Sequence, residues 1–162
     1  VVIGVPSFHR LAVRGLEMPG YPERLLPLEV SELADTPFVL LSSGTTVRAI
    51  SDSLFAREGI YPTIVFETNN NLVLSSMIRR GAGAGFLPRS AMVKDADDIV
   101  YFSISPRYYL NLAIFLPKNK KLSEAERYLL YLVICQDKNN PLYMPYMNEY
   151  ARNIYNEFSG KE

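Results

Sequence analysis

The chain alternates short apolar runs with segments whose apolar residues recur every three or four positions. The apolar runs, each bounded by proline, glycine or a polar cluster, predict strands at residues 1–6, 37–41, 61–68, 82–88, 97–105 and 108–117. The segments with the longer period predict helices at residues 28–35, 42–59, 69–81 and 123–133. Strands that alternate with helices are typical of an α/β fold, and we expect a largely parallel sheet.

Start and stop signals support two of these helices in particular. Residues 42–59 open with a cluster of serine and threonine and end at Gly59, which is a common helix stop. In the helix predicted at 123–133, Ser123 and Glu126 have the spacing of a capping box. The segment after the first strand is rich in proline and glycine, so we expect a crossover there rather than a long helix.

Gly81, Gly83 and Gly85 alternate with alanine and resemble a phosphate-binding loop at first sight. A dinucleotide loop has its glycines after a strand and before a helix, where the helix N-terminus faces the pyrophosphate. Here the order is reversed, because Gly81 follows a predicted helix and the other two lie in the next strand. We therefore expect Gly81 to end the helix, and Gly83 and Gly85 to permit a close packing contact.

Charge and cysteine content narrow the classes of function. The 162 residues include 17 basic and 17 acidic side chains, so the net charge is zero and the chain has no overall attraction to DNA or to an anionic membrane. Cys135 is the only cysteine, which precludes an intrachain disulfide. No apolar run is long enough for a membrane span, and we expect a soluble, cytoplasmic protein. Because the chain begins Val-Val without an initiator Met, we expect it to be cut from a longer one.

Residues suited to catalysis or metal binding are sparse. His9 is the only histidine, and the sequence places no acidic or cysteine partner beside it, so a solvated or capped role is favoured over a catalytic base. Cys135 lies among apolar helix positions and is most simply a small core residue. The chain has no cysteine pair and no second histidine, hence no metal-ligand spacing. We expect no enzyme activity, no cofactor and no metal.

Polar clusters follow two successive predicted strands, in the stretches LLSSGTTVR and FETNNN. Open α/β sheets bind ligands beyond the carboxyl ends of their strands, where free N–H groups and the positive ends of helix dipoles face the ligand. Each of Thr45, Thr46, Thr68 and Asn69 alone is more simply a helix N-cap. Two such clusters on successive strands nevertheless favour one shared small-molecule cleft.

Arg48 is placed in the first turn of its predicted helix, where a cation opposes the helix dipole. Local helix stability therefore does not explain it. Arg48 could pair with the carboxylate of a bound ligand, or with Asp52 one turn further on, and the sequence favours neither alternative.

Four stretches in this order resemble the effector-binding domain of LysR-type transcriptional regulators: VVIGVPSFHRLA, VSELADTPFVLLSSGTTVR, GIYPTIVFETNNNLVLSSMIRRGAGAGFLPRSA and LNLAIFLPKNKKLSEAERYLLYLV. No one motif is decisive, but their order and spacing are specific and extend to about Val133. The resemblance implies a type 2 periplasmic-binding-protein-like fold, in which a small effector binds between two α/β subdomains. Arg10 departs from the family, which commonly has proline after the histidine.

The resemblance also implies a domain organisation. One complete subdomain would occupy residues 28–103, while residues 1–27 and 104–134 would belong to an incomplete first subdomain. Residues 135–162 form a tail that the resemblance does not cover. There we expect a helical face packed on its own domain and made of Met147, Tyr150, Ile154 and Phe158.

The function that we favour is an effector-sensing domain without catalytic activity, and its effector would be a small anion. The intact regulator would be a homo-oligomer that reaches DNA only through an absent N-terminal winged helix-turn-helix. The alternative is a periplasmic-type solute-binding protein or an enzyme on the same fold. The effector-binding residues that we predict are Ser43, Thr45, Thr46, Arg48, Thr68, Asn69, Gly85 and Phe86.

Overall fold

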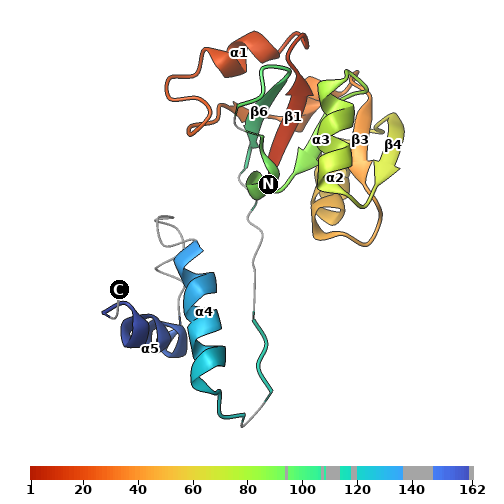
Figure 1. Ribbon diagram of the computed structural model, residues 1–162. Coiled ribbons are helices and arrows are strands. Elements are labelled where there is room, and N and C mark those ends of the chain that lie inside the picture. Colours follow the sequence, from red (N-terminus) through yellow and green to blue (C-terminus); the bar gives the residue numbers. More distant parts are fainter. Residues whose placement is uncertain (94, 107, 109–113, 118–119, 137–147, 161–162) are drawn as a thin grey trace. The chain divides into compact units, whose positions relative to one another are not determined.

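The computed structural model describes residues 1–93, 95–106, 108, 114–117, 120–136 and 148–160 (Figure 1). The chain divides into two compact units, Val1–Leu112 and Ala113–Glu162. Each unit has its own cluster of buried apolar side chains.

The first unit contains the mixture of strands and helices that the sequence predicts. Its elements are β1 (Val2–Pro6), α1 (Ala12–Leu16), β2 (Pro27–Leu28), the 3-10 helix η1 (Val30–Leu33), β3 (Phe38–Leu41), α2 (Thr46–Glu58), β4 (Ile64–Thr68), α3 (Asn71–Arg79), β5 (Gly85–Leu87), the 3-10 helix η2 (Arg89–Ala91) and β6 (Ile99–Ile104).

Three details differ from the predicted elements. The helix expected at 28–35 is only the single 3-10 turn η1, and the crossover after β1 contains the short helix α1. Of the strand expected at 108–117, residues 109–113 lie outside the described residues. Residues 114–117 adopt no regular secondary structure.

The strands pair as a four-stranded sheet in the order β2-β6-β1-β5 and a two-stranded sheet, β3-β4. β1 is antiparallel to both β5 and β6, whereas β2 is parallel to β6 and β3 is parallel to β4. The strand pairing is therefore a mixture of parallel and antiparallel, and the expectation of a largely parallel sheet was wrong. An apolar run has the same pattern in either chain direction, so the reversed direction of β1 has no signal in the sequence.

Ala84 joins the two sheets. Ala84 forms an isolated parallel bridge with Phe38. Its N–H donates to the carbonyl of Pro37, and its own carbonyl accepts from the N–H of Val39, both at 2.8 Å. Through this bridge β5 lies beside β3, and the strands form one continuous layer.

The glycines on either side of Ala84 make this approach possible. A Cβ at Gly83 would lie 2.2 Å from the carbonyl oxygen of Pro37, and one at Gly85 would lie 2.7 Å from that of Val39. Both distances are shorter than any tolerable contact, so the expected close packing of these glycines is confirmed. Gly81 has a φ of +84° and donates its N–H to the carbonyl of Ile78, so it does end α3.

Helices α2 and α3 pack on the sheet through different side chains. The ring centroid of Phe55 in α2 lies 4.8 Å from that of Phe38 and 5.6 Å from that of Phe86. Leu74 and Ile78 of α3 are fully buried in the same core. The side chains of the strands alternate between the two faces.

In the described part of the second unit the regular elements are two helices, α4 (Glu124–Gln136) and α5 (Glu149–Phe158). The capping box predicted for α4 is confirmed: the Ser123 N–H donates to Glu126 Oε2 at 2.9 Å, and the Glu126 N–H donates to Ser123 Oγ at 3.3 Å. Hydrogen bonds from Lys120 and Ser123 hold the pKa of Glu126 at about 2.

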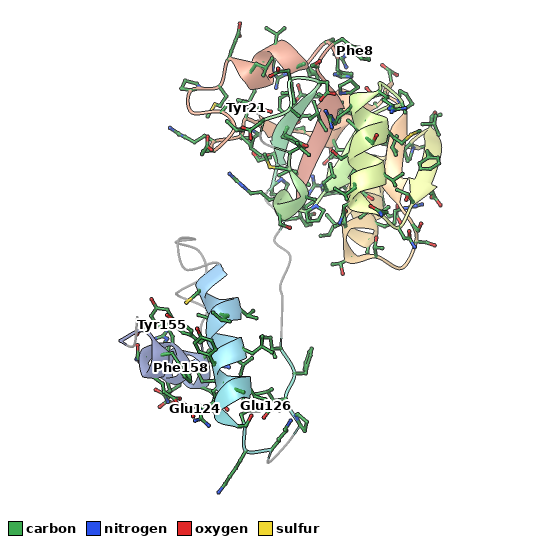
Figure 2. The ribbon with its side chains drawn as sticks, viewed as in Figure 1. Phe8, Tyr21, Glu124, Glu126, Tyr155 and Phe158 are labelled. Carbon is green, nitrogen blue, oxygen red and sulfur yellow. The ribbon has the colours of Figure 1, made fainter. Side chains whose placement is uncertain are left out.

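Aromatic side chains hold α5 against α4. The ring centroid of Tyr131 lies 5.9 Å from that of Tyr155 and 5.7 Å from that of Phe158. Tyr155 and Phe158 both belong to α5 (Figure 2). Ile154 and Phe158 are buried as expected, whereas Tyr150 is half exposed. Met147, the remaining member of the predicted face, lies outside the described residues.

The contact at Ala84 leads to a test of the fold. Replacing Gly83 with alanine should lower the free energy of unfolding by about 3 kcal/mol, because the new Cβ forces β3 and β5 apart. Gly59→Ala is the matched control: Gly59 has a φ of +65° but open space around it. We expect this control to lose only about 1 kcal/mol. Urea unfolding measures both, and equal losses would contradict the role given to Gly83.

Candidate functional site

The carboxyl ends of β3 and β4 meet at one edge of the sheet. The two strands are parallel, with Leu41 opposite Thr68 in the register. The N–H of Ser42 donates to the carbonyl of Thr68 at 2.8 Å, so the two chains are still paired where they leave the sheet. The junctions β3–α2 and β4–α3, which the sequence singled out, are therefore neighbours in space.

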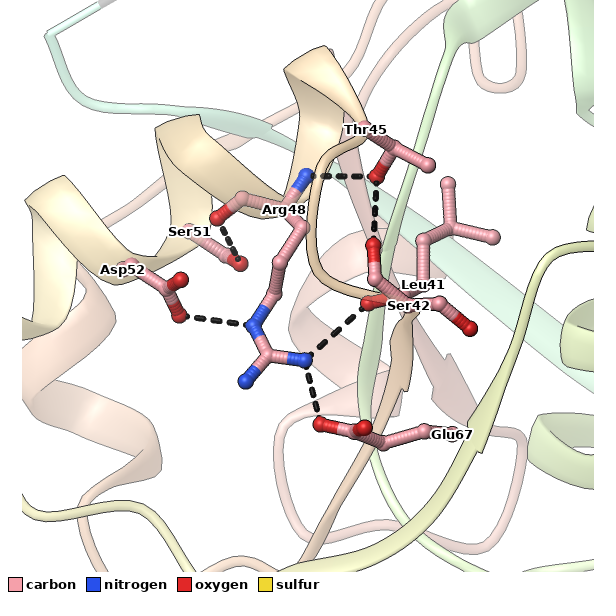
Figure 3. Close-up of polar contacts among 7 residues, drawn as sticks. All are labelled: Leu41, Ser42, Thr45, Arg48, Ser51, Asp52 and Glu67. Carbon is pink, nitrogen blue, oxygen red and sulfur yellow. Dashed lines mark hydrogen bonds and ion pairs between the residues drawn. The ribbon is translucent and has the colours of Figure 1, made fainter.

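In the β3–α2 junction, Thr45 is the N-cap of α2. Its Oγ1 accepts from the N–H of Arg48 at 3.2 Å and donates to the carbonyl of Ser42 at 3.1 Å (Figure 3). Thr45 is therefore a helix N-cap, which is the simpler of the two roles that its position in the sequence suggests. Thr46 and Ser43 are exposed, and neither side chain makes a hydrogen bond within the described part of the chain.

In the β4–α3 junction the cap is Asn70, which the sequence analysis did not identify. Its Oδ1 accepts from the N–H of Leu72 at 2.8 Å. Thr68 Oγ1 accepts from the N–H of Asn70 at 3.2 Å, just outside the helix. Asn69 is exposed, and its side chain is left without a hydrogen bond among the residues described here. The run of three asparagines contained the signal for a cap, but not which of the three it is.

Both helix N-termini have backbone N–H groups without an acceptor among the described residues. Helices begin with N–H groups that have no partner within the helix, and caps satisfy only some of them. Throughout the described residues, no acceptor is found for the backbone N–H groups of Ser43, Gly44, Thr46, Val47, Asn69 and Asn71. These donors lie at the positive ends of two helix dipoles on one edge of the sheet, which favours an anion.

Arg48 ties the junctions together through its side chain. Nε donates to Asp52 at 2.8 Å, and Nη1 donates both to the carbonyl of Leu41, at 3.1 Å, and to the carboxylate of Glu67 (Figure 3). The sequence left two partners open for Arg48, a ligand carboxylate or Asp52, and the structure contains the pair with Asp52. Although burial lowers the pKa of Arg48, the hydrogen bonds that it donates to Asp52 and Glu67 raise its pKa above the ordinary value.

Glu67 and Thr68 follow one another in β4, so their side chains point to opposite faces of the sheet. Glu67 turns toward α2, where it meets Arg48. Thr68 consequently lies on the face that α3 covers. The sequence had no signal for the pairing of Glu67 with Arg48, because these residues are far apart in the chain and only the β3–β4 register brings them together.

Gly85 and Phe86 are not brought together with the junction residues. Ala84 is opposite Phe38, so the carboxyl end of β5 at Leu87 is level with the end of β3. Gly85 and Phe86 lie inside the sheet before that edge, and the ring of Phe86 is buried in the core.

The other residues considered for chemistry have structural roles. His9 Nδ1 accepts from the N–H of Leu11 at 3.3 Å, and Nε2 lies 3.1 Å from Thr36 Oγ1. Burial, with a smaller effect from Arg10, lowers the pKa of His9, so the neutral ring is favoured. Cys135 is half-buried in α4. Within the described ranges, acidic, histidine and cysteine side chains form no group able to hold a metal ion.

A helix needs about 20 predominantly apolar residues to cross a bilayer. Among the helices that the structure describes, none is both long enough and apolar enough to cross a bilayer.

Comparison with known proteins identifies the family. The fold is the type 2 periplasmic-binding-protein-like fold, and residues 18–134 match the LysR substrate binding domain. The chain belongs to this family.

Solved structures with a similar fold are effector domains. The regulatory domain of CcmR from Synechocystis PCC6803, in complex with 2-PG, has a TM-score of 0.61 and 18% identity over 86% of this chain and 63% of that one. The effector binding domain of QuiR with shikimate has a TM-score of 0.57 and 19% identity, covering 86% and 61%. The BenM effector binding domain with benzoate has a TM-score of 0.52 and 16% identity, covering 91% and 61%. This chain thus spans less than two thirds of each.

The two caps can be separated from their neighbours by mutation. Thr45→Ala and Asn70→Ala should each lower the free energy of unfolding by about 1 kcal/mol, since each removes an acceptor for a helix N–H. The adjacent changes Thr46→Ala and Asn69→Ala should alter it by less than about 0.5 kcal/mol. Denaturant unfolding measures all four. Similar losses in the neighbouring variants would mean that Thr46 and Asn69 also act as caps.

Proposed function

We propose that this chain is the effector-sensing part of a LysR-type transcription regulator and that it binds a small anion at the edge where β3 and β4 end. The observation that carries the proposal is the set of unused N–H donors at the start of α2 and α3, beside the hydroxyls of Thr46 and Thr68. Free N–H donors at two neighbouring helix N-termini suit a carboxylate or a phosphate.

The bound ligands of the related domains support this ligand class. Shikimate, bound by QuiR, and benzoate, bound by BenM, are both carboxylates at neutral pH. In this chain Ser43, Thr46, Thr68 and Asn69 would supply side-chain donors, and Thr45 would hold the loop that carries the free N–H groups. Gly85 and Phe86 would support the edge from inside the sheet.

The proposed mechanism is a shift in population between two arrangements of the sensing domain. An effector shifts such an equilibrium only to the extent that it binds one arrangement more tightly than the other. Residues 28–103 would carry the binding edge, residues 1–27 and 104–134 would connect to a partner subdomain, and residues 135–162 would form the tail. DNA would be bound by another part of the intact, homo-oligomeric and cytoplasmic regulator.

The absence of catalysis is part of the same proposal. His9, the one histidine, contacts Leu11 and Thr36, and burial lowers its pKa. It lies in the crossover after β1 rather than at the β3–β4 edge. The alternatives are a periplasmic-type solute-binding protein or an enzyme on this fold. Chemical conversion of a bound ligand would favour the enzyme.

The ligand site can be tested with two threonine variants. A panel of small carboxylates and phosphates that includes shikimate and benzoate should contain a ligand for this chain, detected by calorimetry. Thr46→Val and Thr68→Val should each weaken its binding by about tenfold or more, because each removes a hydrogen bond to a charged group.

Thr63→Val is the matched control for these variants. Thr63 is an exposed threonine that precedes β4, at the opposite end of the strand from Thr68. Its replacement should leave the affinity unchanged. Unchanged affinity in both junction variants, or an equal loss in the control, would remove the threonines from the proposed site.

A further inference from the structure

We infer that Arg48 is a positioning residue: its guanidinium holds the β3–α2 and β4–α3 junctions in one arrangement, so that their free N–H groups face the same ligand. This inference rests on the proposed function. It also assigns Arg48 a role different from that of a direct ligand to the effector.

Arg48 closes the β3–α2 loop from both sides. Its backbone N–H donates to Thr45 Oγ1 at the end of the loop, and its Nη1 donates to the carbonyl of Leu41 at the start. The loop between these contacts contains Ser43 and Gly44, whose N–H groups have no acceptor in the described structure. One residue therefore fixes the segment that presents these donors.

Arg48 also connects this loop to the neighbouring β4–α3 junction. The same Nη1 donates to the carboxylate of Glu67, which immediately precedes Thr68 in β4. Thr68 in turn accepts from the Ser42 N–H through its carbonyl and from the Asn70 N–H through its hydroxyl. A displacement of either junction would therefore disturb the contacts of the other.

The charge and burial of Arg48 also favour a positioning role. A cation in the first turn of α2 is opposed by the helix dipole, so its position needs compensation. Asp52 and Glu67 provide two carboxylates for the one guanidinium, and the cluster of three has a net charge of −1 at neutral pH. The Arg48 side chain is only 13% exposed, against 53% and 43% for its partners. A guanidinium already shared between two carboxylates is poorly placed to neutralise a third.

Lysine cannot reproduce this set of contacts. A guanidinium presents several N–H donors in a rigid planar fork, whereas an ammonium is a single point of charge on a flexible stem. One Lys nitrogen would have to satisfy the Leu41 carbonyl and the carboxylates of Asp52 and Glu67 together. A role that depends on the geometry of Arg48 therefore predicts that Arg48→Lys fails nearly as fully as Arg48→Met.

The first part of the test measures amide hydrogen exchange without any ligand. The reporters are the Ser42 N–H, bonded to Thr68, and the Ala49 N–H, bonded to Thr45. In Arg48→Met and Arg48→Lys both amides should exchange about tenfold faster, because the junction opens locally more often.

Two controls separate local opening from general destabilisation. Arg57→Met removes an arginine near the other end of α2, where it is paired with Glu58, and should leave both reporters unchanged. The Ser103 N–H, bonded to the Leu26 carbonyl in another part of the sheet, should keep its rate in every variant. Unchanged reporters, or equal acceleration of Ser103, would overturn the inference.

The second part of the test follows a titration with benzoate by NMR. A positioning role predicts that the Arg48 Nε–H resonance stays in place while the amides of the β3–α2 loop shift, and that Arg48→Met weakens binding about tenfold. A shift of the guanidinium resonance as large as those of the amides would show direct contact and overturn the inference. If benzoate does not bind at all, the proposed function fails for this ligand, while hydrogen exchange still decides the role of Arg48.

Discussion

The close approach of β5 to β3 is the constraint on which the rest of the first unit depends. Ala84 can pair with β3 only because neither Gly83 nor Gly85 has a Cβ to occupy the space beside the carbonyls of Pro37 and Val39. This contact joins the two sheets into one layer. It sets the carboxyl ends of β3 and β5 level with each other, and β4, paired with β3, extends the same edge.

Because of this geometry, two helices begin at one edge of the sheet, and some of their first N–H groups have no acceptor among the described residues. The caps Thr45 and Asn70 satisfy some of the first N–H groups, and the exposed neighbours Thr46 and Asn69 satisfy none. Positive potential from both helix ends is therefore available to a ligand. The cationic Arg48 contributes little of it, because Asp52 and Glu67 already neutralise its charge. The proposed site therefore rests on free backbone N–H donors, while the charge of Arg48 is already paired with two carboxylates.

The local features of this fold could be predicted from the sequence because short-range signals determine them. The helix stop at Gly81, the capping box of Ser123 and the positions of most strands follow from spacing and residue type alone. The direction of β1 could not be predicted, since an apolar strand is the same in either direction. The same holds for the Arg48–Glu67 pair, which exists only because of the register between β3 and β4. Among the predicted site residues, the threonines of the two junctions lie at one edge of the sheet, whereas Gly85 and Phe86 lie inside it.

In the proposed site, a small anion binds through backbone N–H groups at the β3–β4 edge. This binding can be followed in amide NMR spectra of the unmodified chain, recorded during titration with shikimate and benzoate in turn. The largest shifts for the carboxylate that binds should occur at Ser43, Gly44, Thr46 and Asn69, whose amides have no acceptor within the described residues. Binding whose largest shifts fall elsewhere, with these amides unmoved, would contradict the proposed site.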